Sequence, residues 1–375
     1  MGDRQYLART RGPSDVALVL PSFGSGGAER VILNLAGAFE ALGARVRLIV
    51  LDPDGPLRGS VADGVEVVDL HVPRVRRAAR RLIAELRKRP ADLLIGSQTH
   101  LNLLLALIRP GLPQRTGLLL REPNLLPADA RDARQDRLVG WLLGRADLVV
   151  ASSEAMRDHL VTTVASRSQV RVLPNPVDVQ SLRSAARDGS PLGHDDGLVS
   201  VGRLTDQKGY EDLLDALSRV PGDRRLTVLG GGPLRSSLED RVHRLGLSDR
   251  VRFVGRVDEP ETLTATVARA ALLVHPAHYD GMPNAVLEAL ALGTPVLATT
   301  DLDVLRGLAE EVGPAALRLV PRAALAEAIE DSASATPTRG SGDLRPSLLP
   351  ERFDMNGVVH ALLDAYEDVR ASSGA

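Results

Sequence analysis

Two carboxylates, Asp280 and Glu288, stand eight positions apart where a loop leads into a helical pattern. Between them, Gly281 lets the backbone approach a ligand closely, and Pro283 suits the first position of a helix. The free N–H groups and the positive dipole end of such a helix favour an anion. The backbone could therefore hold a phosphate while the two acids bind hydroxyl groups on either side of it. A phosphate flanked by two polyols describes a nucleotide sugar, with ribose on one side and a hexose on the other.

A second loop carries the positive charge that a diphosphate would need. It runs from Gly202 to Gly209, between an apolar strand pattern and a helical pattern, and it contains Arg203 and Lys208. Arginine and lysine at the carboxyl end of a strand can clamp a diphosphate. The residue order is not that of a Walker A loop. Basic residues in a surface loop are more often simply solvated, so this loop alone does not decide the function.

Glycine-rich turns follow three further strand patterns. The first contains Gly24, Gly26 and Gly27, but Glu29 occupies the third glycine position of a G-x-G-x-x-G fingerprint, which argues against NAD. The other two turns can form a flat slot for a nucleobase through their backbone amides. The residues expected at that slot are Gly231, Arg256 and Val257. Taken singly, each turn is also an ordinary strand–helix connection.

Several polar side chains of the first half follow later strand patterns, where they would face a ligand. They are His100, Arg121 and Asn124. In the second half, His275 and His278 bracket Asp280. No group of His, Asp and Glu has the spacing of a metal site, so we expect no metal and no cofactor.

The composition is that of an ordinary globular protein. Of the 375 residues, 44% are hydrophobic and 25% charged, and the formal net charge is −2, which offers no overall attraction to nucleic acid. The chain has no cysteine, as expected in a reducing compartment. No apolar run reaches the roughly 20 residues of a membrane span, and no signal peptide pattern opens the chain. We therefore expect a cytoplasmic protein with no nucleic acid partner.

Short β-rich apolar runs alternate with helical patterns along the chain. The runs cover 15–20, 45–51, 65–70, 92–95, 117–120 and 147–151, then 197–201, 226–229, 251–254, 271–274 and 295–298. The helical patterns cover 28–42, 128–143 and 154–164, then 209–220, 233–245 and 285–292, with a last helix over 351–369. This alternation predicts an α/β fold with two doubly wound parallel sheets, whose ligands bind at the carboxyl ends of the strands.

Two polar stretches set the expected boundaries. Residues 181–196 have no apolar period, and residues 331–350 are rich in Ser, Thr, Pro and Gly. The predicted organisation is a polar extension over 1–14, Rossmann-like domains over 15–180 and 197–350, and a terminal helical segment over 351–375.

One segment is strongly basic. Residues 74–89 form an amphipathic helical pattern with many arginines and with Val75, Leu82 and Leu86 on one side. Such faces are usually solvated. A basic helix can also rest on anionic lipid head groups, so we expect either a solvated surface or a peripheral contact with the inner face of a membrane.

Together these motifs resemble the family-4 retaining glycosyltransferases of the GT-B fold. The matching segments occur in the family's order over nearly the whole chain, which is more specific than any single motif. They are 26–30, 152–154, 175–178, 201–209, 230–233 and 280–288. The resemblance implies two Rossmann-like domains facing across a cleft, the first on the acceptor side and the second binding the nucleotide sugar. It also implies that the C-terminal helix crosses back to the first domain.

The resemblance also implies roles for the residues. Arg203 and Lys208 would neutralise the diphosphate as the glycosidic bond breaks. Glu288 would accept hydrogen bonds from the ribose hydroxyls, and Asp280 would hold hydroxyls of the transferred sugar. The remaining donor-binding positions would be Gly26, Gly27, Gly202, Gly231, Arg256, Val257, Gly281, Met282, Pro283 and Asn284.

This chain departs from the family pattern at two points. The family's E-x7-E motif begins with Glu, whereas here Asp280 has a reach one methylene shorter, which leaves the identity of the sugar open. Many relatives also carry a histidine in the first-domain cleft, where this chain reads Arg121-Glu-Pro-Asn124. Either Arg121 or His100 would then contact the sugar or the acceptor.

The implied reaction retains the anomeric configuration through a front-face, ion-pair-like transition state. No enzymatic nucleophile takes part, because a donor phosphate oxygen removes the proton of the acceptor hydroxyl. We expect a UDP-linked hexose or N-acetylhexosamine as donor. The acceptor stays open among lipid-linked oligosaccharide, polysaccharide, small metabolite and protein, in a cell-surface polysaccharide, glycolipid or glycoconjugate pathway.

Two other functions fit the same residues. A nucleotide-sugar epimerase would bind a similar donor and use an acid–base pair around the sugar, which His100 or His278 could form with Asp280. It would change the sugar without any acceptor. A non-catalytic protein that binds sugar nucleotides is the other alternative.

Overall fold

The computed structural model describes residues 12–24, 26–72, 75–122, 133–163, 170–192, 197–332 and 344–373. Asn124, the start of the helix predicted over 128–143 and part of the polar stretch 331–350 lie outside these residues, as do most of the polar extension 1–14 and Arg74 of the basic segment. The chain divides into two compact units. Unit 1 comprises Met1–Pro176 and Arg352–Ala375, and unit 2 comprises Val177–Glu351.

Unit 1 is built on a parallel sheet of seven strands in the order β3-β2-β1-β4-β5-β6-β7. Its central strands are buried on both faces, which explains their continuous Val, Leu and Ile runs. The strands are β1 (Asp15–Ser22), β2 (Arg45–Asp52), β3 (Glu66–Asp69), β4 (Leu93–Ser97), β5 (Gly117–Glu122), β6 (Leu148–Ala151) and β7 (Val170–Val172). The apolar runs do not predict β7, because its three residues have Arg171 at their centre.

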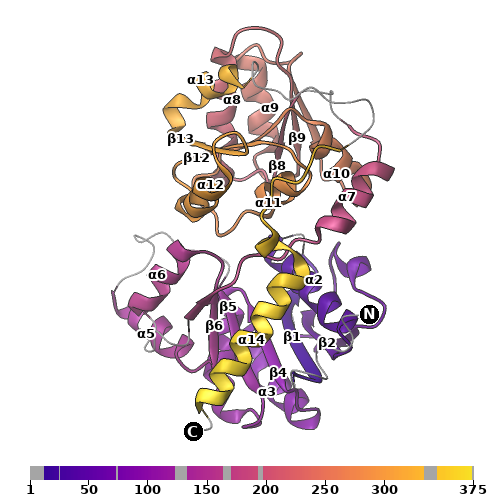
Figure 1. Ribbon diagram of the computed structural model, residues 1–375, viewed down its shortest axis with the longest axis vertical. Coiled ribbons are helices and arrows are strands. Elements are labelled where there is room, and N and C mark those ends of the chain that lie inside the picture. The colour runs from indigo at the N-terminus through magenta and orange to yellow at the C-terminus, as the bar shows by residue number, and fades with distance from the viewer. Residues whose placement is uncertain are drawn as a thin grey trace. The chain divides into compact units, whose positions relative to one another are not determined.

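Helices cover both faces of this sheet. Two of them, α2 and α14, lie side by side on one face and share a core that includes Phe39 and Leu363 (Figure 1). The core of the other face includes Leu82, Leu105 and Met156. The helices are α2 (Gly27–Ala41) and α14 (Met355–Ser373) on the first face, and α3 (Val75–Lys88), α4 (Thr99–Ile108), α5 (Ala133–Leu143) and α6 (Glu154–Thr163) on the second.

The last helix ties the end of the chain to unit 1. A 3₁₀ turn over Glu351–Phe353 precedes α14, which continues past the predicted end at residue 369. The Tyr366 hydroxyl donates to the carbonyl oxygen of Asp92 at 2.8 Å, just before β4 begins. The Tyr366 side chain thereby joins the C-terminal helix to the central strands.

Unit 2 is built on a parallel sheet of six strands in the order β10-β9-β8-β11-β12-β13. The strands are β8 (Leu198–Val201), β9 (Leu226–Leu229), β10 (Val251–Gly255), β11 (Leu272–His275), β12 (Val296–Thr299) and β13 (Leu317–Val320). The helices are α7 (Val179–Asp188), α8 (Tyr210–Arg219), α9 (Arg235–Arg244), α10 (Pro260–Arg269), α11 (Asn284–Ala291), α12 (Arg306–Val312) and α13 (Leu325–Asp331). One core joins α8, α9 and α13 to the sheet, and α7 packs closely against α10.

Helix α7 corrects the expectation that residues 181–196 form an irregular break. The Asp178 side chain caps this helix, accepting hydrogen bonds from the Ser181 backbone N–H at 2.8 Å and from its hydroxyl at 2.7 Å. Only Ala186 of α7 is fully buried, and the other apolar residues of the same face, Val179, Leu182 and Ala185, are half-buried. This apolar face is short and lies among many polar residues, so capping by Asp178 and packing against α10 are needed to complete the helix.

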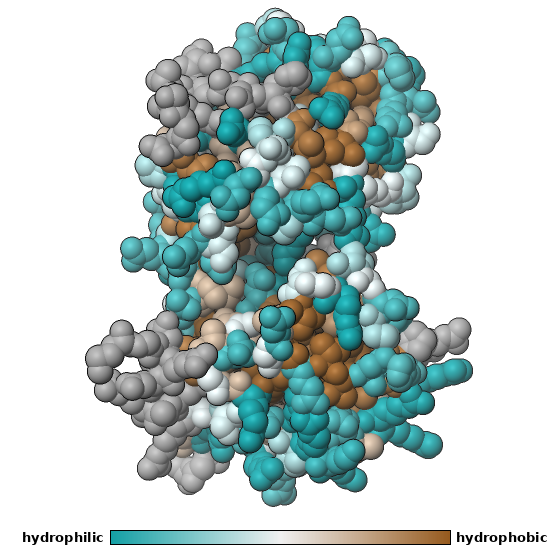
Figure 2. Space-filling model, turned by 90° about the vertical axis from the view of Figure 1, so that its right-hand side faces the viewer, coloured by the Kyte–Doolittle hydropathy of each residue, from teal (hydrophilic) through white to brown (hydrophobic). Residues whose placement is uncertain are grey.

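The surface carries both hydrophilic and apolar side chains. The face shown in Figure 2 is mostly hydrophilic, with apolar patches between the polar side chains. The exposed large apolar side chains of the described residues are Leu107, Leu138, Trp141 and Tyr279. Among the helices described, none is both long enough and apolar enough to cross a membrane.

Candidate functional site

The candidate site of unit 2 begins where two neighbouring strands end. Strands β8 and β11 pair in parallel, so their carboxyl ends reach the same edge of the sheet. The loop after β8 contains Arg203 and Lys208, and the loop after β11 contains Asp280. The fold thus brings the two predicted loops to one place, although Lys208 and Asp280 are 72 positions apart in the sequence.

The two loops are locked to each other through Gln207. Its carbonyl oxygen accepts a hydrogen bond from the His278 backbone N–H at 2.8 Å, and its side-chain amide donates to the Tyr279 carbonyl oxygen at 3.0 Å. Gly209 follows at a φ of +63°, and a Cβ there would lie 2.2 Å from the Pro276 carbonyl oxygen. Only glycine fits this conformation and this close approach.

Asp280 is the centre of a compact charged cluster. Its Oδ2 atom accepts from the Lys208 ammonium and lies 3.3 Å from His275 Nε2, and its Oδ1 atom accepts from the Gly281 backbone N–H at 3.0 Å. The side chains of Lys208 and Asp280 are 19% and 13% exposed, whereas that of His275 is only 3% exposed. The ion pair can therefore be reached from solvent, while the imidazole supports it from inside.

Burial and charge set the ionisation of this cluster. Burial alone would raise the pKa of Asp280, but the hydrogen bond from His275 and the positive charge of Lys208 outweigh it and hold that pKa below its ordinary value. Burial lowers the pKa of His275, against the opposing pull of Asp280. The cluster is therefore a carboxylate held between an ammonium and a neutral imidazole.

The other predicted donor residues of unit 2 surround these loops. Arg203 is exposed, and the Lys208 chain runs past Gly202, whose added Cβ would lie 3.7 Å from Lys208 Cδ. Gly230 has a φ of +144°, and a Cβ there would lie 1.9 Å from the Gly202 carbonyl oxygen. By contrast, a Cβ on Gly231 would point into open space. The loops after β8 and β9 are thus in close contact at Gly230, whereas Gly231 borders open space.

Helix α11 starts within the Asp280 loop. Pro283 occupies its N-cap position and Asn284 its first turn, while Met282 is buried beneath them. Glu288 lies one turn further along and is half-buried. Arg256 lies in a different setting, because it is exposed and its guanidinium pairs with Asp258 at 2.5 Å. Val257 beside it is half-buried.

In unit 1, the predicted glycines and histidine lie at the carboxyl ends of β1 and β4. Gly26 and Gly27 are exposed at the start of α2, and the Glu29 carboxylate folds back so that a Cβ on Gly26 would meet its Oε2 atom at 2.2 Å. His100 is exposed in the first turn of α4, just after Gln98, which holds an unusual φ of +82°. Loss of solvent around the ring lowers the pKa of His100, and the charge of Glu29 opposes this shift.

Arg121 lies at the end of β5 and is sealed from solvent. It is 2% exposed, and its guanidinium donates to the side-chain oxygen of Asn175. The Asn102 side chain donates to the Arg121 carbonyl oxygen at 2.8 Å, and Thr99 donates to the carboxylate of Glu122. Burial lowers the pKa of Arg121 to about 10, although the charge of Glu122 favours the cation.

Sequence reasoning missed some members of the unit 2 cluster. The sequence identifies His275 only as a neighbour of Asp280, although a histidine that ends a buried apolar strand is a usable signal. Two further residues brace the Asp280 loop: Asp212 contacts His278 Nε2 at 2.9 Å, and Arg322 pairs with Asp212 and Asp301. No local pattern marks Asp212 or Arg322, because these contacts link distant parts of the chain.

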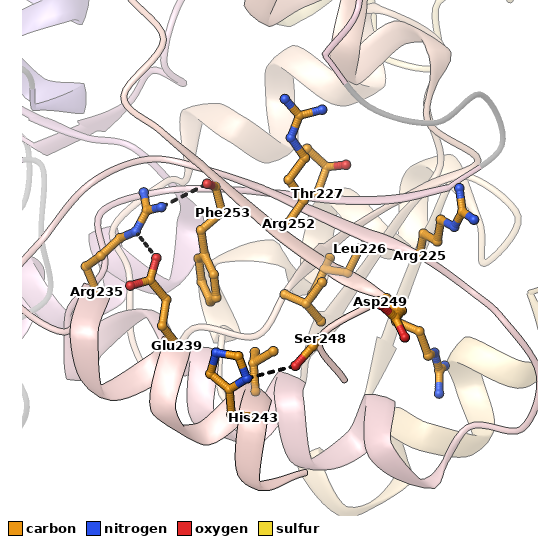
Figure 3. A pocket seen from close by; sticks show the side chains of 13 residues that line it. Arg225, Leu226, Thr227, Arg235, Glu239, His243, Ser248, Asp249, Arg252 and Phe253 are labelled. Atoms are coloured by element: carbon orange, nitrogen blue, oxygen red, sulfur yellow. Dashed lines mark hydrogen bonds and ion pairs between the residues drawn. The ribbon is translucent and has the colours of Figure 1, made fainter. Parts of the chain in front are cut away.

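A separate groove of about 510 Å³ lies beside β10, the edge strand of unit 2 (Figure 3). Several of its polar side chains already have partners: Arg235 donates to the Glu239 carboxylate at 2.7 Å and to the Phe253 carbonyl oxygen at 2.9 Å, and His243 contacts Ser248 at 2.9 Å. None of the predicted donor residues lines it, so we assign it no role. Within the described ranges, no group of three or more His, Asp or Glu side chains could hold a metal ion.

Two family models match the chain, one in each unit. Residues 25–181 match the model described as glycosyltransferase family 4, and residues 195–334 match the model described as glycosyl transferases group 1. The two matches follow each other along the chain without overlap.

Curated relatives show the same likeness. The chain is 30% identical over 239 residues to a glycogen synthase of Mycobacterium tuberculosis, covering 60% of this chain but only 55% of that protein. It is 24% identical over 303 residues to a Campylobacter jejuni enzyme, covering 76% of this chain and 80% of that one. That enzyme is named N-acetylgalactosamine-N,N'-diacetylbacillosaminyl-diphospho-undecaprenol 4-alpha-N-acetylgalactosaminyltransferase.

Among solved structures, Anabaena HepE in complex with UDP and glucose superposes with a TM-score of 0.67 at 19% identity. The match covers 96% of this chain and 98% of the other. At this identity the likeness concerns the fold, and it confirms the predicted α/β class and GT-B architecture.

Proposed function

We propose that this chain, which belongs to the family-4 glycosyltransferases and is therefore a transferase, moves a sugar from a nucleoside diphosphate sugar to a hydroxyl acceptor. The observation that carries this proposal is the cluster at the ends of β8 and β11, where Lys208 and Asp280 meet beside the exposed Arg203. Two cations at the carboxyl edge of a parallel sheet suit a diphosphate. The donor we favour is a UDP-linked hexose or N-acetylhexosamine.

The similar proteins support a donor of this kind. One structural neighbour was solved with UDP and glucose and again with UDP-glucose. In this chain, Arg203 and Lys208 would bind the diphosphate, and Glu288 would lie on the ribose side. Gly202, Gly231, Val257 and the 281–284 backbone would line the donor. Arg256 would join them once released from Asp258.

The proposed chemistry is transfer with retention of anomeric configuration. As the bond to the sugar breaks, negative charge grows on the diphosphate, and the ammonium of Lys208 and the guanidinium of Arg203 offset it. A phosphate oxygen of the donor then accepts the proton of the acceptor hydroxyl, so no side chain has to act as nucleophile. We propose that side-chain cations, without a metal or cofactor, carry this charge.

Unit 1 would serve the acceptor side. His100 presents an imidazole at the carboxyl edge of its sheet, while Gly26 and Gly27 stay proposed donor-binding positions. The name of the Campylobacter relative refers to a diphospho-undecaprenol substrate, which supports a lipid-linked acceptor here. Arg121 stays a weaker candidate for contact with the acceptor, because it is only 2% exposed.

A peripheral membrane contact would bring the enzyme to such an acceptor. Helix α3 exposes Arg77 and Arg80, and the helices α4 and α5 beyond it expose Leu107, Leu138 and Trp141. Exposed basic residues and an exposed tryptophan on the same unit suit anionic lipid head groups. Sedimentation with phosphatidylglycerol vesicles tests this contact. The parent protein should bind these anionic vesicles and not neutral phosphatidylcholine vesicles. An Arg77→Glu/Arg80→Glu variant should lose the binding.

The decisive experiment screens nucleoside diphosphate sugars for thermal stabilisation and then for transfer to polyprenyl-diphosphate glycans. A bound donor raises the apparent stability by mass action. Lys208→Ala should abolish this rise, whereas Lys88→Ala on α3 should leave it intact in the absence of membranes. If no nucleotide sugar stabilises the parent protein, or if the sugar is altered without an acceptor, the proposal is wrong.

A further inference from the structure

Every acceptor atom of Asp280 already has a partner within the protein. Oδ2 lies between the Lys208 ammonium and His275 Nε2, and Oδ1 accepts the Gly281 backbone N–H. The side chain is one methylene shorter than the glutamate of the family pattern, so its carboxylate stays close to its own backbone. These contacts direct the carboxylate toward Lys208 and His275.

Lys208 keeps donors for a ligand in this arrangement. An ammonium has three N–H donors, and Asp280 takes one of them. The Lys208 side chain is 19% exposed, and it passes beside Gly202 in the loop that carries Arg203. Anchoring by Asp280 therefore fixes the direction of the long, flexible side chain while its remaining donors stay available to a phosphate.

His275 completes the anchor from the interior. It is the last residue of β11, and its side chain is 3% exposed. The charged groups that face its ring among the described residues are Asp280 and Lys208. With an ionised Asp280 as its partner, the imidazole has to carry its proton on Nε2. His278, three residues further on, points to Asp212 instead and is 46% exposed.

We infer that His275 is a positioning residue of the transfer reaction: it holds Asp280, and Asp280 holds Lys208 against the donor diphosphate instead of binding the transferred sugar. This inference rests on the proposed function. Substitution of His275 or Asp280 should therefore weaken the neutralisation of the diphosphate charge, which every donor needs. It should not change the discrimination between sugars.

A double-mutant cycle separates these two roles. If Asp280 acts through Lys208, Asp280→Asn in a Lys208→Ala background should have little further effect, because the group it anchors is gone. A sugar-binding Asp280 would instead give independent losses that multiply, and its removal would change the ratio of kcat/KM between two UDP-sugars. Either of those results would overturn the inference.

Variants of His275 test the interior contact. His275→Leu removes the donor and should lower kcat about tenfold, while His275→Gln keeps an N–H near the same place and should recover most of the loss. Without that donor the pKa of Asp280 rises, so the acid limb of the kcat profile should move to higher pH in His275→Leu alone. The matched variant His278→Leu should leave the limb in place.

A measurement without turnover distinguishes failure of this inference from failure of the proposed function. Nitrogen-15 NMR of histidine-labelled protein, with His275→Gln for assignment, should show His275 neutral with its proton on Nε2 at about pH 7, and protonated only at a lower pH than an exposed histidine. A His275 that titrates as an ordinary imidazole, or that carries its proton on Nδ1, contradicts the inference even if the protein transfers sugar. If His275 shows the expected tautomer but the protein binds no nucleotide sugar, the contacts among His275, Asp280 and Lys208 are supported and the proposed function is wrong.

Discussion

Arg121 of unit 1 and Lys208 of unit 2 are both cations at the carboxyl end of a parallel strand, yet their surroundings are opposite. Arg121 is 2% exposed, and it donates to the neutral side chain of Asn175 within a layer of hydroxyl and amide groups. Lys208 is 19% exposed and pairs with a carboxylate. The first cation is sealed inside the protein, and the second can be reached by a ligand.

This difference indicates which cation supports the fold and which supports chemistry. A buried cation has lost its hydration, so its neighbours must satisfy it, and removing it disturbs them. A partly exposed cation can bind a phosphate in addition to its protein partner with little rearrangement. We therefore expect substitutions of Arg121 to change stability first, and substitutions of Lys208 to change activity first.

The largest effect should come from Lys208→Ala. Loss of the ammonium leaves the charge on the departing diphosphate poorly neutralised, so the transfer rate should fall by about a hundredfold or more. The melting temperature should fall only by the part of the Asp280 stabilisation that Lys208 supplies, because the carboxylate keeps its contacts with His275 and the Gly281 backbone. Steady-state rates with saturating donor test this, with Lys88→Ala as the matched lysine control. A parent-like rate would remove Lys208 from the catalytic set.

Arg121→Met should show the reverse pattern. It keeps the bulk of the side chain but removes the buried cation, which leaves Asn175 and Glu122 without its charge. We expect the free energy of unfolding to fall by about 3 kcal/mol. Urea denaturation measures this loss. A fully stable variant that no longer transfers sugar would show that Arg121 serves the ligand, and the contrast between the two cations would then disappear.

The pH dependence of stability sharpens the comparison within unit 2. Because the folded state holds the pKa of Asp280 below its unfolded value, ionised Asp280 stabilises the protein at neutral pH by about 2 kcal/mol. That contribution is complete above the unfolded pKa and disappears as the pH falls through the folded one. Denaturation of the parent and of Asp280→Asn at pH 7, 4 and 3 should show a difference in the free energy of unfolding that is constant down to about pH 4 and narrows below it.

The smallest effect should come from Gly231→Ala, and its neighbour Gly230 provides the comparison. Gly230→Ala should destabilise unit 2, because its Cβ would collide with the Gly202 carbonyl oxygen at a φ of +144°. Gly231→Ala should leave stability unchanged within about 0.5 kcal/mol. Its Cβ would enter the open space where we place the donor, so the donor Kd should rise a few-fold. Isothermal titration with the best donor measures this, and equal behaviour of the two variants would contradict the assignment.

The sequence predicts the strands of both sheets well where they are uniformly apolar, but it fails at β7, β13 and α7. An arginine interrupts each of the two strands, and the few apolar residues of α7 lie among many polar ones. Apolar runs alone do not identify such elements, because much of their stability comes from pairing, capping and neighbours. The positions of Arg203, Lys208 and Asp280 at one sheet edge follow from the order of strands and loops alone.

The partners within the site could not be predicted in the same way. No sequence pattern states that Asp280 contacts Lys208 and His275, or that Arg121 is sealed behind Asn175, because these contacts depend on side-chain packing. The contacts of Asp212 with His278 and Arg322 depend equally on segments that are far apart in the chain. Residue types therefore predict the chemistry of the site, whereas three-dimensional packing decides which residues are available for it.

The contact between Gly209 and Pro276, together with the two hydrogen bonds of Gln207, has a consequence for engineering the donor preference. The loops after β8 and β11 form one interlocking block, so a loop transplanted from a relative would meet a foreign partner at every one of these contacts. Exchange of both loops together preserves the block, and exchange of one breaks it. Libraries that aim at a new sugar should therefore vary residues 202–209 and 276–283 as a single cassette.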